Sequence, residues 1–504
     1  MSFSLAYLIE RVGGELAIAS PEGASRTVSG LQLDSRMITD GDLFAAVSPN
    51  SIDAARFAAD AQDRGAVAVL TPLEFDRRAV TLPVWLHPDP RRAAGEAAAL
   101  LQGEPARELR TCAITGTNGK TTTAHLIGQI MRRAKLAPAI IGTTGYQLAD
   151  GFVEASHTTP DAPRLQALLA RHRAAGGRSA VLEVSSHALV QARTAGIHFD
   201  VAVFTNLSRE HLDYHGDMQR YADAKALLFS QLGPDATAVV NADDPASDIM
   251  TQAALGAGAR VVTFSSRARA DLRAGQLSTD LQGSRFVLEG MGIDASALRS
   301  PLRGRYNVEN ALAAAAASRV LGASPGDVLT GLATTSPAPG RLEPVPTGGR
   351  GFSLFVDFAH SPDALQHVLS CLREGLEVES ERGKSRGRLI LVFGCGGERD
   401  AGKRPIMGRV AAEFADVAIV TSDNPRGEDP DQILDEILSG MPSPAARFEH
   451  IVEGDRRRAI TRALEVARPG DVVLLAGKGH ESTQSIGDRV HAFDDRQVAM
   501  EVLA

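Results

Sequence analysis

The chain of 504 residues contains little cysteine, has no excess of positive charge and has no long apolar run. Its cysteines, Cys112, Cys371 and Cys395, are odd in number and far apart, which favours neither a disulfide framework nor a paired zinc site. The formal net charge of −8 lacks the basic footprint of general nucleic-acid binding. No apolar run approaches the roughly 20 residues of a membrane span, and the first residues lack the basic region and cleavage site of a signal peptide. We therefore expect a cytoplasmic protein with no nucleic-acid partner and no membrane span.

The alternation of two kinds of segment predicts an α/β fold. Short apolar runs rich in strand-forming residues alternate with Ala- and Leu-rich stretches of helical spacing along nearly the whole chain. Several of these runs have polar or glycine residues at their carboxyl ends, where open parallel sheets bind ligands. We expect strands at 111–115, 180–184, 201–205, 238–241, 352–358, 389–394, 417–421 and 471–476.

The length of the chain predicts about three domains, and two breaks in the pattern divide it. Residues 102–110 are polar and form a connector, while residues 334–340 contain two prolines and a glycine that interrupt an Ala-rich helical region. The run Ala313–Ala317 is expected in a helix that packs tightly on a neighbour. The breaks predict a small α/β domain, a central domain and a third domain, at 1–106, 107–338 and 339–504.

Residues 114–122 have the sequence I-T-G-T-N-G-K-T-T and lie between an apolar run and a segment of helical spacing. A glycine-rich turn between a strand and a helix leaves backbone N–H groups that converge on one small volume. The positive end of the helix and the ammonium of Lys120 add to that potential, which suits a polyphosphate. Thr121 would then hold the Mg²⁺ that accompanies ATP or GTP. The motif predicts a P-loop, although two residues separate its glycines instead of the general four.

Further candidate groups follow the next strands of the central domain. Glu183 ends a strand in L-E-V-S-S-H, where a carboxylate can hold a nucleotide's Mg²⁺ or position a water, or can simply cap the next helix. In T-N-L-S-R-E-H-L-D-Y-H-G, His211 and His215 stand four apart, but Leu212 replaces the glutamate of a zinc-protease motif. We expect His211 near magnesium and phosphate and His215 in a structural role. Lys225 lies in a strong helical pattern, where a lysine is ordinarily a solvated surface group.

The third domain has four polar strings, each at an expected strand end. They are D-F-A-H-S-P-D-A-L (357–365), F-G-C-G-G-E-R-D (393–400), T-S-D-N-P-R (421–426) and A-G-K-G-H-E (476–481). We expect all four loops on one edge of a sheet. Asn424 and Arg426 flank a proline that fixes the local backbone, and a rigid arginine fork beside an amide can bind a carboxylate. In isolation, the tetrapeptide D-N-P-R (423–426) would indicate only a surface turn with a salt bridge.

Together these motifs resemble the Mur ligase family of peptidoglycan synthesis, over almost the full length of the chain. The strings G-T-N-G-K-T-T, E-V-S-S-H, T-N-L-S-R-E-H-L-D-Y-H-G, D-F-A-H-S-P-D-A-L and D-N-P-R occur in this order. Within the family, the chain is most similar to the members that add the third residue of the stem peptide to UDP-N-acetylmuramoyl-L-alanyl-D-glutamate. The resemblance implies an N-terminal uridine-binding domain, a central ATPase domain with a mainly parallel sheet, and a C-terminal Rossmann-like domain that binds the amino acid.

The resemblance also implies roles for individual residues, with ATP as co-substrate and Mg²⁺ as cofactor. The catalytic group would be Lys120, Glu183, His211 and Lys225. The metal would be held by Thr121, Glu183, His211 and Lys225, the last as a carbamate, which converts the lysine cation into a carboxylate-like ligand. ATP would contact Gly116, Thr117, Asn118, Gly119, Lys120, Thr121, Thr122, Asn307, Arg341, Asp357 and His360. The UDP-sugar peptide would contact Ser35, Thr158, Thr159, Ser185, Gln191 and Arg193. The incoming amino acid would contact Arg399, Asp423, Asn424, Arg426, Gly477 and Glu481.

The implied reaction is phosphorylation of the γ-carboxylate of the D-glutamyl residue by ATP, followed by attack of the amino group of a diamino acid, in a monomeric enzyme. The D-N-P-R string resembles the members that add meso-diaminopimelate, and ligation of L-lysine is the alternative. Two further alternatives are a folylpolyglutamate synthetase-like ligase with the same type of P-loop and a P-loop switch protein that hydrolyses nucleotide only to change partners. The loop around Asp53 lacks the glycine that is usual in the family, so we assign no pyrimidine contact there.

Overall fold

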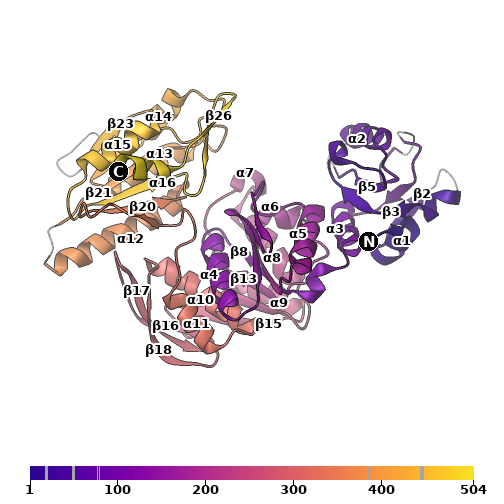
Figure 1. Ribbon diagram of the computed structural model, residues 1–504, viewed down its shortest axis with the longest axis horizontal. Helices are drawn as coiled ribbons and strands as arrows, with labels where there is room; N and C mark the ends of the chain where they lie inside the picture. Colours follow the sequence, from indigo (N-terminus) through magenta and orange to yellow (C-terminus); the bar gives the residue numbers. More distant parts are fainter. Residues whose placement is uncertain (18–20, 48–50, 77, 79, 384–385, 443–447) are drawn as a thin grey trace.

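The computed structural model describes residues 1–504 except for 18–20, 48–50, 77, 79, 384–385 and 443–447. The chain forms three α/β units, each with its own main sheet, and the central unit lies between the other two (Figure 1). The predicted α/β class with three domains is confirmed, while the proposed boundaries after residues 106 and 338 remain predictions. None of the described helices has the length and apolar character needed to cross a bilayer.

The N-terminal unit has a small, mainly parallel sheet. Its strands are β1 (Phe3–Ser4), β2 (Glu15–Ala17), β3 (Thr27–Val28), β4 (Gly30–Gln32), β5 (Asp42–Ala45), β6 (Ala68–Thr71) and β7 (Val84–Leu86), and its helices are α1 (Leu5–Val12), α2 (Ser51–Asp63) and α3 (Pro90–Leu101). The main sheet has the order β2-β7-β6-β5-β4, in which β2 alone is antiparallel to its neighbour. Strands β1 and β3 form a separate antiparallel pair.

The central unit is built on an eleven-stranded sheet. Its strands are β8 (Arg110–Thr115), β9 (Pro138–Gly142), β10 (Gly145–Leu148), β11 (Gly151–Val153), β12 (Ser179–Glu183), β13 (Val201–Phe204), β14 (Thr237–Asn241), β15 (Arg260–Ser265), β16 (Leu272–Asp280), β17 (Gly283–Gly290) and β18 (Ile293–Ser300). Its helices are α4 (Lys120–Arg133), α5 (Ala162–Ala174), α6 (Ser186–Val190), α7 (Leu212–His215), α8 (Met218–Ser230), α9 (Ser247–Gly256), α10 (Arg305–Val320) and α11 (Pro325–Ala333). The order is β11-β10-β9-β12-β8-β13-β14-β15-β16-β17-β18, and the pairs from β9 to β16 are parallel.

Both faces of the central sheet are covered by helices, as a parallel sheet requires. The core on one face joins β8 and β13 to α4, α10 and α11, and the core on the other face joins the same strands to α5, α8 and α9. The run Ala313–Ala317 lies in α10 and is fully buried against the sheet and α4. Small side chains there let the helix axes approach closely, which confirms the expected tight packing.

The C-terminal unit has a six-stranded sheet in the order β19-β20-β24-β21-β22-β23, parallel except for β19. Its strands are β19 (Glu343–Val345), β20 (Ser353–Asp357), β21 (Leu389–Phe393), β22 (Val417–Val420), β23 (Glu449–Val452) and β24 (Val472–Ala476), with a hairpin of β25 (Thr483–Ile486) and β26 (Arg489–Ala492). Its helices are α12 (Pro362–Glu381), α13 (Lys403–Phe414), α14 (Pro430–Leu438), α15 (Arg456–Val466) and α16 (Asp495–Leu503). Because β24, the last strand of this sheet along the chain, lies between β20 and β21, the order of the strands reverses there, and such a point marks the ligand-binding crevice of an open sheet.

The strands that we expected in the central and third domains are all present, with ends that differ by at most one residue. The antiparallel extension β16–β18 was not predicted. The sequences of these strands have few β-branched residues, and their buried apolar residues, such as Leu272, Phe286 and Leu288, alternate with exposed polar ones, so no continuous apolar run marks them.

Among the contacts that join the units, one at each end of the central unit involves a closely approached glycine. Gly95 of α3 lies so near Ala162 and Ala195 that a Cβ atom at this glycine would overlap the central unit. At the other end, Leu281, in the turn between β16 and β17, belongs to the apolar core of the C-terminal unit and lies against Gly375 of α12. Figure 1 shows β17 reaching toward α12.

The packing of α10 gives the first prediction. Ala314→Leu should lower the free energy of unfolding by about 1–3 kcal/mol, because extra methylene groups have no room in this close-packed core. Ala174→Leu, at the exposed end of α5, is the matched control and should change stability by less than about 0.5 kcal/mol. Urea denaturation of both variants measures the difference, and equal stabilities would contradict the packing argument.

Candidate active site

The P-loop lies between β8 and α4, and its two glycines are required by the space around them. Gly116 and Gly119 have φ angles of +148° and +86°, which disfavour any side chain. A Cβ atom at Gly116 would collide with the Thr205 hydroxyl, and one at Gly119 would collide with the Asn310 amide. The backbone N–H groups of Thr117 and Asn118 both bond to Asn206, at 2.9 Å, so the donors that remain for a ligand are those at the N-terminus of α4.

Lys120, the first residue of α4, folds back over the loop. Its Nζ donates hydrogen bonds to the carbonyl oxygens of Gly116 at 2.7 Å and Thr117 at 2.8 Å. Burial lowers the pKa of Lys120, and the carboxylates of Glu210 and Glu183 act against that shift. A phosphate bound in the loop would supply the anion that this ammonium lacks.

Glu183 is the most enclosed carboxylate of the central site, with an exposed fraction of 1%. It accepts hydrogen bonds from the Thr121 hydroxyl at 2.8 Å, from the Thr143 N–H at 3.0 Å and from the Thr143 hydroxyl at 3.1 Å. Arg341, from the linker that leads to the third unit, donates to the same Thr121 hydroxyl at 3.2 Å. Thr121 and Glu183 are thus neighbouring oxygen ligands of the kind that Mg²⁺ prefers.

Lys225 is buried in α8 with 1% of its surface exposed, which contradicts the ordinary expectation of a solvated helix lysine. Its Nζ lies 4.2 Å from the ring centre of Tyr221, and among the described residues it makes no hydrogen bond or ion pair. Burial lowers the pKa of Lys225 well below its ordinary value, and the nearby Lys120 lowers it further. A neutral amine is the form that reacts with CO₂, so this environment suits the predicted carbamate.

His211 begins the short helix α7 with a φ of +55°, and its side chain is 44% exposed. Its ring lies 4.9 Å from that of His187, and burial lowers the pKa of both histidines. His215 is buried, and its Nε2 lies 2.9 Å from the Ser186 hydroxyl, in agreement with a structural role. Among the described residues, no three His, Cys, Asp or Glu side chains are placed to hold a metal. The proposed metal site has only two residues of these types, Glu183 and His211. A carbamate on Lys225 would add a third ligand of this kind and a second negative charge.

The residues expected to hold the UDP-sugar peptide form a path from the N-terminal unit to Glu183. Ser35 lines a cavity of 700 Å³ in the N-terminal unit, and Gln191 and Arg193 line a second cavity of 220 Å³ at the junction with the central unit. Leu33 borders both cavities. Residues 48–50, in the loop that precedes Asp53, lie outside the described part of the chain.

The path continues through the hydroxyl groups of Thr159, Thr158 and Ser185. Arg193 donates two hydrogen bonds to Gln191 Oε1, from Nε at 3.0 Å and from Nη2 at 2.7 Å. Its Nη1 donates to the Thr159 carbonyl at 2.8 Å. The Thr159 hydroxyl donates to the Glu183 carbonyl at 2.8 Å. The Thr158 hydroxyl lies 3.0 Å from that of Thr143, and Ser185 caps α6 next to Glu183.

Two candidate nucleotide residues shape the linker and its surroundings. Both Asp357 oxygens accept backbone N–H groups, from Leu342 at 2.6 Å and Ala359 at 2.8 Å, and burial raises the pKa of this carboxyl. The resulting turn places Arg341 over the ring of Phe358, 4.7 Å from its centre, and toward the P-loop. Asp357 therefore positions Arg341, and its direct contact with the nucleotide remains a prediction.

The other two candidates also have internal partners. Asn307, in α10, donates to the Arg303 carbonyl at 2.9 Å and accepts from Asn310 at 3.1 Å. The His360 ring makes a hydrogen bond of 2.8 Å with the Phe358 carbonyl.

Near the candidate site, sequence reasoning missed the contacts that Asp363 and His480 of the third unit make with the central unit. One Asp363 oxygen accepts hydrogen bonds from the side chains of Asn118 and Ser208, each at 2.8 Å. The His480 imidazole lies 3.1 Å from the Thr143 carbonyl. No spacing in the sequence links these pairs, because the third unit brings them together only after it has folded.

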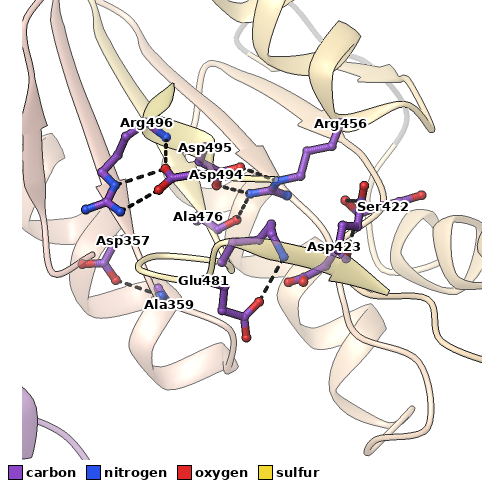
Figure 2. Close-up of polar contacts among 12 residues, drawn as sticks. Asp357, Ala359, Ser422, Asp423, Arg456, Ala476, Glu481, Asp494, Asp495 and Arg496 are labelled. Atoms are coloured by element: carbon purple, nitrogen blue, oxygen red, sulfur yellow. Dashed lines mark hydrogen bonds and ion pairs between the residues drawn. The ribbon is translucent and has the colours of Figure 1, made fainter. Parts of the chain in front are cut away.

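The four polar loops of the third unit do lie on one edge of its sheet, because β20, β24, β21 and β22 are neighbouring parallel strands. Gly477, with a φ of +110°, approaches Asp423 so closely that a Cβ atom would lie 2.7 Å from its Oδ2. The amide of Asn424 donates to Glu481 at 2.9 Å. Figure 2 shows the side chains of Asp423 and Glu481 near each other at this edge of the sheet. Arg399 is exposed on the neighbouring loop.

Arg426 also belongs to this edge, with an unusual backbone angle, φ = +53°. Its backbone N–H donates to Ser485 of β25 at 3.0 Å, and its Nη1 donates to the Gly397 carbonyl at 2.7 Å. In the described part of the chain, Nε and Nη2 have no hydrogen-bond partner. This side of the guanidinium can therefore bind a carboxylate through two parallel N–H groups.

The comparisons with known proteins show the family of the chain. Residues 114–318 match the model of the Mur ligase middle domain, and residues 340–479 match that of the Mur ligase, glutamate ligase domain. The chain belongs to the Mur ligase family, whose members are ATP-dependent ligases.

Its relatives at high coverage have one printed activity. The chain is 42% identical to the UDP-N-acetylmuramoyl-L-alanyl-D-glutamate–2,6-diaminopimelate ligase of Syntrophomonas wolfei over 483 residues, 95% of each chain. It is 43% identical to the ligase of that name from Solibacter usitatus over 491 residues, 96% of this chain and 95% of the relative. A solved structure with the same name matches with a TM-score of 0.71 at 36% identity, covering 100% of this chain and 99% of the other.

The buried amine of Lys225 gives the second prediction. Lys225→Ala should reduce ligase activity by about 10²–10³-fold, as when one electrostatic group of an active site is lost, and a short carboxylate such as formate should restore part of it. Lys135→Ala, at an exposed lysine, is the control and should keep full activity. Full activity of Lys225→Ala, or an unmodified lysine in crystals grown with bicarbonate, would contradict the carbamate.

Proposed function

We propose that this protein adds meso-diaminopimelate to UDP-N-acetylmuramoyl-L-alanyl-D-glutamate, with ATP as co-substrate. The observation that supports it best is the meeting of three predicted sites around Glu183. The Thr121 hydroxyl of the P-loop helix donates to the Glu183 carboxylate. The Thr159 hydroxyl, on the path from the N-terminal cavities, donates to the Glu183 backbone carbonyl, and Arg341, from the linker to the third unit, donates to Thr121. The close relatives that are named for this reaction give the specific substrates.

The reaction that we propose has two chemical steps. An oxygen of the D-glutamyl γ-carboxylate attacks the γ-phosphorus of ATP, and ADP leaves, which forms an acyl phosphate. The neutral amino group of diaminopimelate then attacks the acyl carbon, the C–O bond to phosphate breaks, and the amine loses a proton as the amide forms. Both steps concentrate negative charge on phosphoryl oxygens near Lys120.

The residues of the chain contribute position and charge in this proposal. The P-loop N–H groups and Lys120 hold the phosphates, and Arg341 adds a second cation from the linker. Mg²⁺, held by Thr121 and Glu183 with His211 and carbamoylated Lys225, would neutralise charge on the phosphoryl oxygens. Contacts of the third unit such as Asn118–Asp363 close the site, which keeps water from the acyl phosphate.

The test is the mass of the product formed from UDP-dipeptide, ATP and candidate amino acids. We expect an amide with meso-diaminopimelate and one ADP for each amide. Lys120→Ala, which keeps the backbone donors of the loop, should lose about 10²–10³ in rate. Use of a folate in place of the UDP-dipeptide would support a folylpolyglutamate synthetase-like ligase, and ATP hydrolysis without an amide would support a switch protein. A monomeric state and a cytoplasmic location remain predictions that gel filtration and cell fractionation can test.

The free side of Arg426 gives a prediction about the amino acid. Diaminopimelate has a distal carboxylate that L-lysine lacks, so lysine would leave the arginine fork unpaired and should be used about 10³-fold less efficiently. Arg426→Ala should weaken diaminopimelate use far more than ATP or UDP-dipeptide use. Arg426→Lys should not restore it, because a point charge cannot form two parallel hydrogen bonds. Equal use of lysine and diaminopimelate by the unmodified enzyme would contradict this specificity while leaving the ligase activity in place.

A further inference from the structure

Lys478, in the loop after β24, is fully buried although it lies in the middle of the proposed amino-acid pocket. Its Nζ donates to the Thr483 carbonyl at 2.6 Å, to Glu481 Oε2 at 3.0 Å and to Asn424 Oδ1 at 3.4 Å. An ammonium has three donors, and all three have protein acceptors here. Lys478 therefore has no donor left for a substrate.

Asn424 is saturated in the same way. Its Nδ2 donates to Asp423 Oδ1 at 3.0 Å and to Glu481 Oε2 at 2.9 Å. Its Oδ1 accepts from Lys478 and from the backbone N–H of Ser485 at 3.0 Å. An amide has two donors and two acceptor positions, and all four of Asn424 are occupied in this structure. Asn424 therefore links Asp423, Glu481, Lys478 and Ser485 and has no free position for a ligand.

These contacts use only one oxygen of each carboxylate. Among the described residues, Glu481 Oε1 and Asp423 Oδ2 have no hydrogen-bond partner. Gly477 leaves the Asp423 oxygen open, since a side chain there would cover it. Lys478 and Asn424 hold the inner oxygens, so they determine where the two outer oxygens point.

A buried ion pair anchors the strand end from which Lys478 projects. Arg456 and Asp495 are both fully buried and share two hydrogen bonds, at 2.8 and 2.6 Å, while Arg456 also donates to the Ala476 carbonyl at 2.9 Å (Figure 2). Ala476 ends β24, two residues before Lys478. The network contains the carboxylates Asp423, Glu481 and Asp495 but only the cations Lys478 and Arg456, so one further cation, such as an ammonium, would balance its charge.

We propose that Lys478 is a positioning residue for the amino-acid substrate. Without touching the substrate, it fixes Glu481 and Asn424 so that the outer carboxylate oxygens receive the amino group. This inference rests on the proposed function, and it assigns to Lys478 the geometry of the pocket and not a bond in the reaction.

The experiment compares Lys478→Met with Lys135→Met, the same change at an exposed lysine. For Lys478→Met, the KM for diaminopimelate should rise about 10- to 100-fold, the effect of leaving a polar group in a pocket misaligned. The kcat and the KM values for ATP and UDP-dipeptide should stay within about threefold of the unmodified enzyme. Lys135→Met should change none of these values.

A double-mutant cycle with Glu481→Gln tests whether Lys478 acts through Glu481. The double variant should have a KM for diaminopimelate no higher than that of Glu481→Gln alone, since the second change would have nothing left to orient. Additive effects, an unchanged KM in Lys478→Met, or an equal loss in every kinetic constant would overturn the proposal. If Lys478→Met does not fold, Lys478→Gln, which keeps donors without the charge, enters the same cycle. Failure of the unmodified enzyme to ligate diaminopimelate would instead refute the proposed function.

Discussion

The structure depends on enclosing the Glu183 carboxylate where water hardly reaches it. A buried carboxylate is costly unless donors surround it, and the chain supplies them from two segments, namely the P-loop helix through Thr121 and the loop after β9 through the N–H and hydroxyl groups of Thr143. The C-terminal unit and its linker approach the same point, because Arg341 contacts Thr121 and His480 contacts Thr143. The requirement to satisfy one carboxylate thus coincides with the place where nucleotide, acceptor and amino acid would meet.

The two large sheets explain why the loops can meet there. In each sheet the parallel strands end on one edge, so residues far apart in sequence become neighbours without any long insertion. In the C-terminal unit, the return of β24 beside β21 brings the loop of Lys478 and Glu481 against the loop of Asn424. The pocket is therefore a consequence of strand order, and its chemistry comes from the residues that directly follow the strands.

Sequence reasoning predicted the elements whose signal is local. The P-loop and the strand-end motifs could be placed because a glycine turn or an apolar run of a few residues has a direct structural meaning. Thr143, Asp363 and Lys478 could not be found in this way, since their partners lie in other loops or in another unit. Asn424 shows a second limit: its residue type suits ligand binding, but only the folded structure reveals that its four hydrogen-bonding positions are occupied. The strands β16–β18 were missed because their buried apolar residues alternate with exposed polar ones and form no continuous apolar run.

The placement of Leu281 has a mechanical consequence. This residue of the central unit is packed in the core of the third unit, while the linker at Arg341 forms a second connection between the same two units. Removing a leucine side chain from an apolar core costs about 1.5–3 kcal/mol, so a motion that separates Leu281 from α12 is disfavoured. A rotation about the line through these two attachments keeps both. A hinge through these two attachments would carry the loops furthest from it the greatest distance, and that motion would have to break the contacts of Asp363 with Asn118 and of His480 with Thr143.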